Sequence, residues 1–118
     1  MTYTNTQLQQ VMAKMLPEYI EAVAEFLNED GSVRERAYAW KYPKVRVSAI
    51  GQLVTDMEWL HLCWLVEERL SRGGMISEYE NYNGNLGMVC SETNSEPVHA
   101  TWQQRTIALA PVKGIEIV

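Results

Sequence analysis

Residues 56–72 constrain the fold of this chain more than any other stretch. They keep a helical period, and apolar side chains cover more than half of the helix circumference. The remaining arc is polar, with Leu65 among its charged and histidine side chains: Glu58, His61, Glu68, Arg69 and Arg72. A helix with so wide an apolar surface must be covered on several sides. We therefore expect it to be the central packing element of the domain, a subunit interface, or both.

Length and composition bound the class of protein. With 118 residues, 47% of them apolar, the chain fits one globular domain over residues 1–118 with a single core. Two cysteines do not make a disulfide framework, and the N-terminus has no basic stretch followed by an apolar run. These features favour a cytoplasmic protein. The stretch 56–72 holds too many charges to span a bilayer, which argues against a membrane protein.

Two further segments have helical patterns. Apolar residues keep a helical period from residue 8 to residue 27, across Pro17. This pattern predicts either one helix kinked at Pro17 or two helices, with Gly31 in the left-handed conformation that often follows a helix. A last helix should begin with Pro97 in its first turn and run to about Ala110.

The expected sheet comes from other segments. Residues 44–50 alternate apolar and polar side chains, and residues 114–118 have the pattern of a short terminal strand. Residues 76–90 are ambiguous, because Asn83-Gly84 suits either a type I′ hairpin turn or the end of a short helix. We favour the hairpin. The predicted fold is α+β, with three to four helices packed around the central helix at 56–72 and a small sheet.

Glu67 is the most unusual residue of the central helix, since it lies within the apolar arc between Cys63 and Leu70. A buried carboxylate must be paired, hydrogen-bonded or protonated. It is either an acid–base or ligand-binding group in a cleft, or one half of a structural ion pair. We favour the ion pair, with Arg46 or Arg105 as partner, because arginine can satisfy both carboxylate oxygens.

Residues 34–46 form a basic and aromatic strip that holds five of the ten basic residues and one acid. Such a composition is typical of surfaces that bind nucleotides or nucleic acid. The strip carries +4 and the whole chain −5, so the rest carries −9, which argues against nonspecific binding of nucleic acid. The strip either pairs internally with acidic side chains at 18–29 or borders a pocket for a small anionic ligand or nucleotide, beside the central helix, in a binding protein or an enzyme. The candidate ligand-binding residues are Arg34, Arg36, Trp40, Tyr42, Arg46 and Glu67.

Motifs for catalysis, metals and cofactors are absent from the sequence. Glu-x-x-His occurs at 58–61 and 96–99, but the first lies on the polar arc and Pro97 interrupts the second. There is no Cys-x-x-Cys pair, nucleophile motif or glycine-rich phosphate loop. These absences favour a nonenzymatic protein without a metal or cofactor.

The leading hypothesis is therefore a small interaction or regulatory protein that acts as a homo-oligomer, such as a homodimer, or with another protein. It rests on the apolar surface, which exceeds what one small core readily covers. We expect Trp64 to anchor the core or an interface. The predicted interface residues are Trp59, Leu62, Leu65 and Val66. No run of residues matches a family signature, although size and composition resemble those of small accessory proteins of bacteria and phages.

Overall fold

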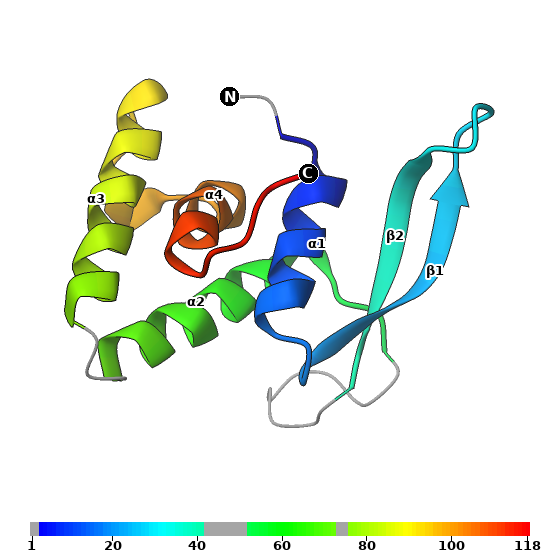
Figure 1. The fold of residues 1–118 in the computed structure, drawn as a ribbon, viewed down its shortest axis with the longest axis horizontal. Coiled ribbons are helices and arrows are strands. Elements are labelled where there is room, and N and C mark those ends of the chain that lie inside the picture. Colours follow the sequence, from blue (N-terminus) through cyan, green and yellow to red (C-terminus); the bar gives the residue numbers. More distant parts are fainter. Residues whose placement is uncertain (1–2, 42–51, 73–75) are drawn as a thin grey trace.

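The computed structural model describes residues 3–41, 52–72 and 76–118. It has an α+β fold, in which four α-helices pack together and a two-stranded antiparallel sheet extends to one side (Figure 1). The elements in chain order are α1 (Asn5–Met15), β1 (Ile20–Leu27), β2 (Val33–Trp40), α2 (Asp56–Arg72), α3 (Ile76–Glu92), a 3₁₀ turn η1 (Pro97–His99) and α4 (Trp102–Val112). The predicted fold class is confirmed.

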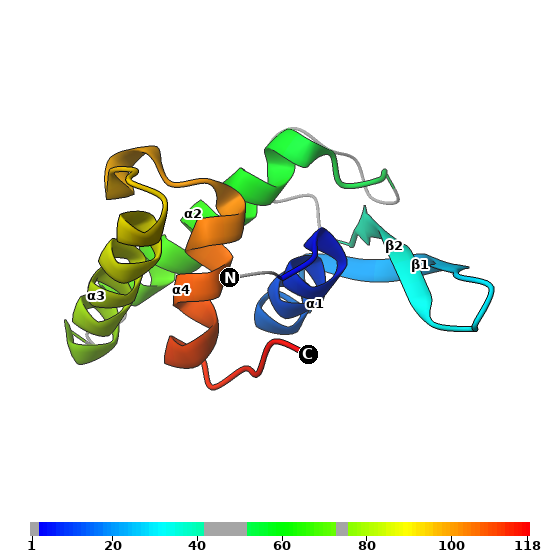
Figure 2. The ribbon, with the colours of Figure 1, turned by 90° about the horizontal axis from the view of Figure 1, so that it is seen from above.

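The helix α2 has the central position that its apolar pattern predicts. It contacts α1, α3 and α4, and Figure 2 shows α1 between α4 and the hairpin of β1 and β2. The indole of Trp59 stacks on Trp102, with ring centroids 5.6 Å apart, and meets Tyr38 of β2 edge-on at 5.5 Å. Aromatic pairs of this kind add about 0.5–1.5 kcal/mol each beyond the burial of their area. Trp59 therefore ties both the last helix and the base of the sheet to α2.

The apolar surface of α2 is covered within the chain itself. Trp59, Leu62 and Val66, predicted as interface residues, are buried in the core, and Leu65 is half-buried. That interface has to be corrected, because these side chains already pack against the chain's own helices and sheet. The large apolar side chains that α2 leaves exposed are Met57 and Trp64, at 80% and 46%.

The segment predicted as one long helical pattern divides at Pro17. Thr4 caps α1 through a capping box with Gln7. The helix ends at Met15, because the ring of Pro17 excludes helical backbone at Leu16, whose φ and ψ are −129° and 55°. The helix predicted over residues 18–27 is wrong.

Residues 20–27 instead form β1, which pairs antiparallel with β2 from Ile20 opposite Trp40 to Leu27 opposite Val33. Gly31 has a φ of +86°, as predicted for a left-handed residue, but it closes a hairpin rather than a helix. The pairing outweighs helix propensity because Ile20 can enter the core only beside Trp40; both side chains are almost fully buried.

The hairpin predicted over residues 76–90 is also wrong, since α3 is one continuous helix through Asn83-Gly84. Its buried side chains recur at the spacing of one helix face: Tyr82, Leu86, Val89 and Cys90. Packing of this face against α4 outweighs the preference of Asn-Gly for a turn. Gly84 and Gly87 therefore lie inside a helix, where an added Cβ would meet no atom within 4 Å.

The C-terminal region differs from the prediction in detail. Pro97 begins the short turn η1, and α4 begins at Trp102, where Thr101 caps it in a second capping box. Pro111 lies in the last turn of α4. The terminal strand expected at 114–118 is wrong, because these residues form no strand. The strand predicted at 44–50 lies outside the described residues.

Replacing Trp59 or Trp64 by alanine tests how α2 is covered. We expect Trp59→Ala to lower the free energy of unfolding by about 3–5 kcal/mol, as for other buried tryptophans. Trp64→Ala should cost about 1 kcal/mol, since nearly half of its indole stays in water. Chemical denaturation of both variants measures the difference. Equal losses would mean that Trp64 is as well covered as Trp59.

Candidate interaction surfaces

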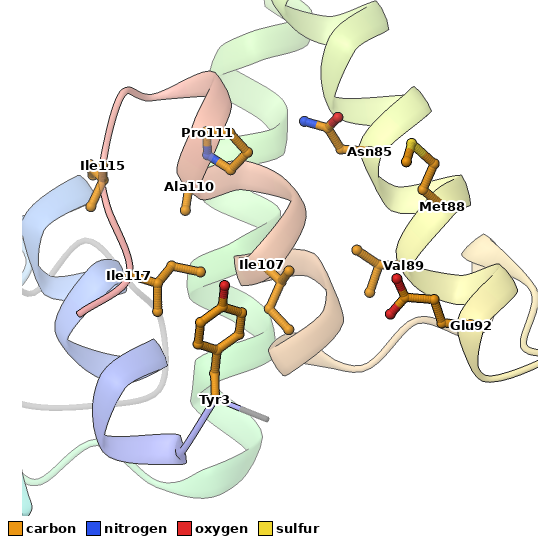
Figure 3. Close-up of a pocket in the computed structure, with 10 residues that line it drawn as sticks. All are labelled: Tyr3, Asn85, Met88, Val89, Glu92, Ile107, Ala110, Pro111, Ile115 and Ile117. Atoms are coloured by element: carbon orange, nitrogen blue, oxygen red, sulfur yellow. The ribbon is translucent and has the colours of Figure 1, made fainter. Parts of the chain in front are cut away.

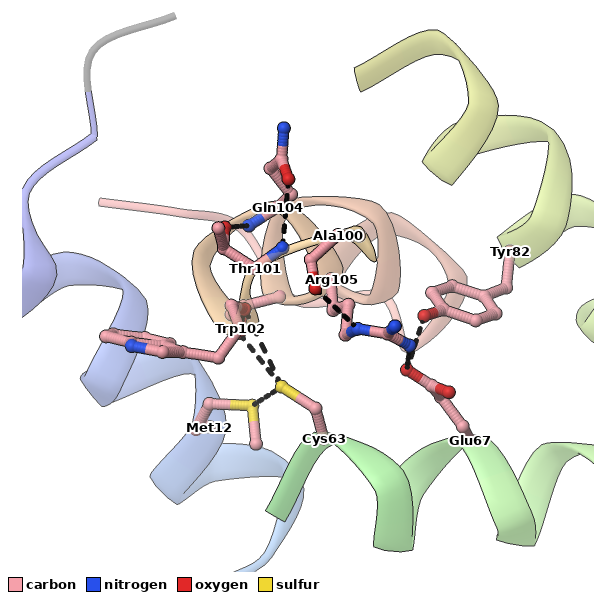
Figure 4. Close-up of polar contacts among 10 residues, drawn as sticks. Met12, Cys63, Glu67, Tyr82, Ala100, Thr101, Trp102, Gln104 and Arg105 are labelled. Atoms are coloured by element: carbon pink, nitrogen blue, oxygen red, sulfur yellow. Dashed lines mark hydrogen bonds and ion pairs between the residues drawn. The ribbon is translucent and has the colours of Figure 1, made fainter. Parts of the chain in front are cut away.

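A charged cluster joins three helices in the core. Oε1 of Glu67 accepts hydrogen bonds from Nη1 of Arg105 and from the hydroxyl of Tyr82, each at 2.6 Å (Figure 4). Nε of Arg105 donates to the carbonyl of Ala100 at 3.1 Å. Arg105 is one of the two partners that the sequence predicts for Glu67, and this prediction is confirmed. The cluster connects α2, α3 and α4.

The electrostatics of this cluster suit a structural role. Burial raises the pKa of the Tyr82 hydroxyl, and the hydrogen bond to Glu67 raises it further. Burial opposes the charge of Arg105, but the hydrogen bond and the attraction to Glu67 outweigh it and raise the arginine pKa. Tyr82 and Arg105 therefore stay protonated around neutral pH, where a general acid or base needs a pKa close to the working pH.

Cys63, one helical turn before Glu67, is a core thiol. Its sulfur lies 3.6 Å from the hydroxyl of Thr106. It lies at the same distance, 3.6 Å, from the carbonyl oxygen of Trp102, a residue labelled in Figure 4. Burial raises the pKa of the thiol to about 12, although the Thr106 hydrogen bond acts in the opposite direction. Cys63 is therefore not an activated nucleophile, because a reactive cysteine needs a lowered pKa and access to solvent.

The predicted anion pocket is not assembled from the described residues. Arg34 and Arg36 line a polar groove beside α1, whereas Glu67 bonds to α3 and α4. The guanidinium of Arg36 already donates to Glu25 at 3.1 Å and to Gln10 at 3.3 Å. Trp40 is buried in the core and offers no ring for stacking. The two other predicted residues, Tyr42 and Arg46, lie outside the described residues.

The hairpin of β1 and β2 carries the most unusual surface. Every residue of β1 after Ile20 is exposed, and three large apolar side chains are among them: Val23 at 52%, Phe26 at 46% and Leu27 at 55%. The edge of β2 that faces away from β1 is hydrogen-bonded, near the base of the hairpin, to residues 52–54. There the Val54 amide donates to the Tyr38 carbonyl at 2.8 Å. Within the described residues β1 has no second strand beside it. In the described part of the chain, the outer edge of β1 is therefore an unpaired strand edge.

Acidic side chains surround these apolar residues. Six acids and two arginines lie between residues 18 and 36, a net charge of −4. Glu25 pairs with Arg36 and Glu18 with Arg69. The other glutamates of the hairpin form no ion pair in the part of the chain that the structure describes: Glu21, Glu29 and Glu35. The hairpin thus combines exposed apolar groups with uncompensated negative charge.

The turn of the hairpin is held by its own side chains. The Asn28 amide donates to the Ser32 carbonyl at 2.8 Å, and the carboxylate of Asp30 accepts from the Ser32 amide at 2.9 Å. The hydrogen bonds from Ser32 lower the pKa of Asp30. These bonds keep the two strands together at the turn, although the pairing register shifts between Phe26 and Leu27 and between Ala22 and Ala24.

A groove lies at the other end of the molecule, between α3, α4 and the C-terminal segment (Figure 3). It has a volume of about 350 Å³. Its walls are mostly apolar, with Asn85 and Glu92 as the polar side chains from α3, and the ring of Tyr3 points into it. The apolar lining is contributed by Met88, Val89, Ile107, Ala110, Pro111, Ile115 and Ile117.

Among the described residues no group of histidine, cysteine and acidic side chains is arranged to hold a metal ion. None of the described helices combines the length and apolarity needed to cross a membrane. No protein-family model matches the chain, and neither a curated protein nor a solved structure matches it. The geometry of the chain itself must therefore support any functional proposal.

Sequence reasoning missed both the hairpin and the groove. Residues 20–27 fit a helical period as well as a strand, so the exposure of Val23, Phe26 and Leu27 followed only from the pairing with β2. The signal that was available is Asn28 to Ser32, a cluster of turn-forming residues. The groove joins Tyr3 to the C-terminal region across the whole chain, and no local pattern reports such a contact.

Removing Arg105 should destabilise the fold far more than removing a surface arginine. In Arg105→Gln the Glu67 carboxylate stays partly buried without its cation. The expected loss is about 3 kcal/mol, the lower end for buried pairs because both side chains keep some exposure. Arg72→Gln is the matched control, since its pair with Glu68 is exposed and should contribute about 0–1 kcal/mol. Urea denaturation at neutral pH compares them, and equal losses would contradict a structural role for the cluster.

Proposed function

We propose that this chain is a cytoplasmic, nonenzymatic protein-binding module, and that the hairpin of β1 and β2 is its binding element. The observation that carries the proposal is the exposure of Val23, Phe26 and Leu27 on an edge strand. Monomeric proteins usually protect such edges, and exposed ones pair with another chain by strand addition. The closed turn supports this role, because it holds β1 and β2 together at the end where Phe26 and Leu27 are exposed.

The charge of the hairpin defines the chemistry of the partner. Uncompensated glutamates next to exposed apolar groups favour a protein surface with lysine or arginine around an apolar centre. A second copy of this chain is disfavoured at this site in the register centred on Val23. Two β1 strands paired antiparallel about Val23 would set Glu21 opposite the second copy's Glu25, and like charges in that position are unfavourable.

Affinity capture from cells that produce the protein naturally tests the proposal. The test variant carries Val23→Ser, Phe26→Ser and Leu27→Ser, and the control variant carries Met57→Ser, Met88→Ser and Val98→Ser, at positions that are more exposed and lie away from the hairpin. We expect the parent and the control to retain the same basic partner, and the test variant to lose it by about tenfold or more, as hot-spot side chains do. Glu21→Lys with Glu29→Lys should also weaken capture, most strongly at low salt.

Retention of the same partner by the serine variant of the hairpin would refute the proposal. So would partners that bind the parent only through the positions changed in the control. Circular dichroism and thermal melting of each variant should match the parent, because all the substituted side chains are exposed. A variant that fails this check is replaced by the two charge reversals.

Self-association is a separate proposal that the sequence analysis raised. It now rests on Met57 and Trp64, whose side chains recur at helical spacing on the exposed side of α2, with the His61 ring 5.1 Å from the Trp64 ring. We expect sedimentation at micromolar concentration to give a dimer for the parent and a monomer for Trp64→Glu. Met88→Glu, which places the same charge on α3, is the control. A monomeric parent would exclude this proposal without affecting the one for the hairpin.

A further inference from the structure

The groove between α3, α4 and the C-terminal segment is built from four separate parts of the chain. Tyr3 precedes α1, Val89 comes from α3, Ile107 from α4 and Ile117 from the last residues, and their side chains converge in Figure 3. Met88 at its edge is 70% exposed. Methionine is a flexible apolar residue that adapts to the shape of a bound group. The volume of about 350 Å³ lies at the lower end of the range for small-molecule sites.

The polar side chains of the groove include two acceptors from α3, beside the Tyr3 hydroxyl. The amide nitrogen of Asn85 donates one N–H to the Ala108 carbonyl at 3.2 Å, which leaves its oxygen and its second N–H for a ligand. The carboxylate of Glu92 forms no ion pair within the described residues, and it points toward the groove beside Val89. None of the described lining residues is basic. The helix α3 as a whole carries three glutamates and no lysine or arginine.

We propose that this groove binds a small amphipathic amine, with the aliphatic or aromatic body between α3 and α4 and the ammonium group at Glu92 and Asn85. The apolar walls favour the body of such a ligand, and the Glu92 carboxylate and the Asn85 oxygen can accept hydrogen bonds from the N–H groups of a cation. A fatty acid or another anion would bring its charge next to Glu92 without a basic residue to compensate it. The small volume favours a small molecule over a helix, whose diameter is about 10–12 Å.

A comparison of three probes that differ only in the head group tests the proposal: octylamine, octanol and octanoate. Each is titrated into the ¹⁵N-labelled protein and followed by two-dimensional NMR. We expect the resonances of Val89, Ile107 and Ile117 to shift together with octylamine. The amine should bind about fivefold more tightly than octanol, the share that one exposed charge pair provides, and octanoate should bind least.

Two variants separate the groove from general attraction to an acidic protein. Glu92→Gln should reduce the affinity for octylamine to that for octanol, while Glu80→Gln, which makes the same charge change on α3 away from the groove, should leave it unchanged. Met88→Arg should abolish amine binding and keep the fold, since this side chain is mostly in solvent. Unchanged thermal melting confirms that each variant is folded.

Several outcomes would overturn the proposal. Octanoate or octanol that binds as tightly as octylamine would remove the role of Glu92, and so would equal losses in Glu92→Gln and Glu80→Gln. Shifts confined to residues outside the groove, or no shifts with any probe at millimolar concentration, would show that the groove is not the site. Groove resonances that depend on protein concentration without a probe would show that a second copy occupies it.

Discussion

The rest of the structure depends on the need to cover one helix. An apolar surface over more than half of α2 has to be covered, either by the rest of the domain or by another subunit. The chain meets the constraint by surrounding α2 with α1, α3 and α4 and by placing Tyr38 at the base of the sheet against Trp59. Trp59, Leu62 and Val66 are buried by the chain's own elements, so these three side chains need no second copy to cover them. Among the large apolar residues of this helix, Met57 and Trp64 are the ones that remain exposed.

Within that core, one ion pair fixes how the helices meet. Leucine, valine and cysteine side chains can slide past one another with little loss of energy, whereas the Arg105–Glu67 pair is satisfied in only one relative position of α2 and α4. The hydrogen bond from Tyr82 adds α3 to the same point. A buried pair of this kind adds little net stability over apolar side chains of the same shape, but it disfavours alternative packings that would leave the charges unpaired. We infer that the cluster contributes specificity more than stability.

The predictions were correct where a local sequence pattern is compatible with only one structure. The width of the apolar arc at 56–72 placed the central helix, and the position of Glu67 within it required a cation, which Arg105 supplies. They were wrong where tertiary contacts decide between two structures that the local sequence allows. Residues 20–27 suit a helix or a strand, and Asn83-Gly84 suits a turn or, less well, a helix. In both cases the deciding contacts, Ile20 beside Trp40 and α3 against α4, lie outside the segment itself.

The candidate sites depend on tertiary contacts in the same way. An anion pocket was expected because cations and aromatic rings cluster in the sequence at 34–46. In the described part of that strip the structure uses them for other purposes: Arg36 neutralises Glu25, and Trp40 fills the core. The exposed hairpin and the groove depend instead on contacts between distant parts of the chain. Their residues are ordinary in sequence and acquire a common surface only after folding.

The two glycines inside α3 have a consequence for how the molecule moves. Each costs a helix about 1 kcal/mol relative to alanine, and α3 also contains three asparagines, which are poor helix formers. Tertiary contacts must therefore supply the stability that this helix lacks on its own. Among the described helices α3 is the one expected to exchange its amide hydrogens first through partial opening. Because α3 forms one wall of the groove, the wall that carries Glu92 belongs to the described helix that we expect to open most readily.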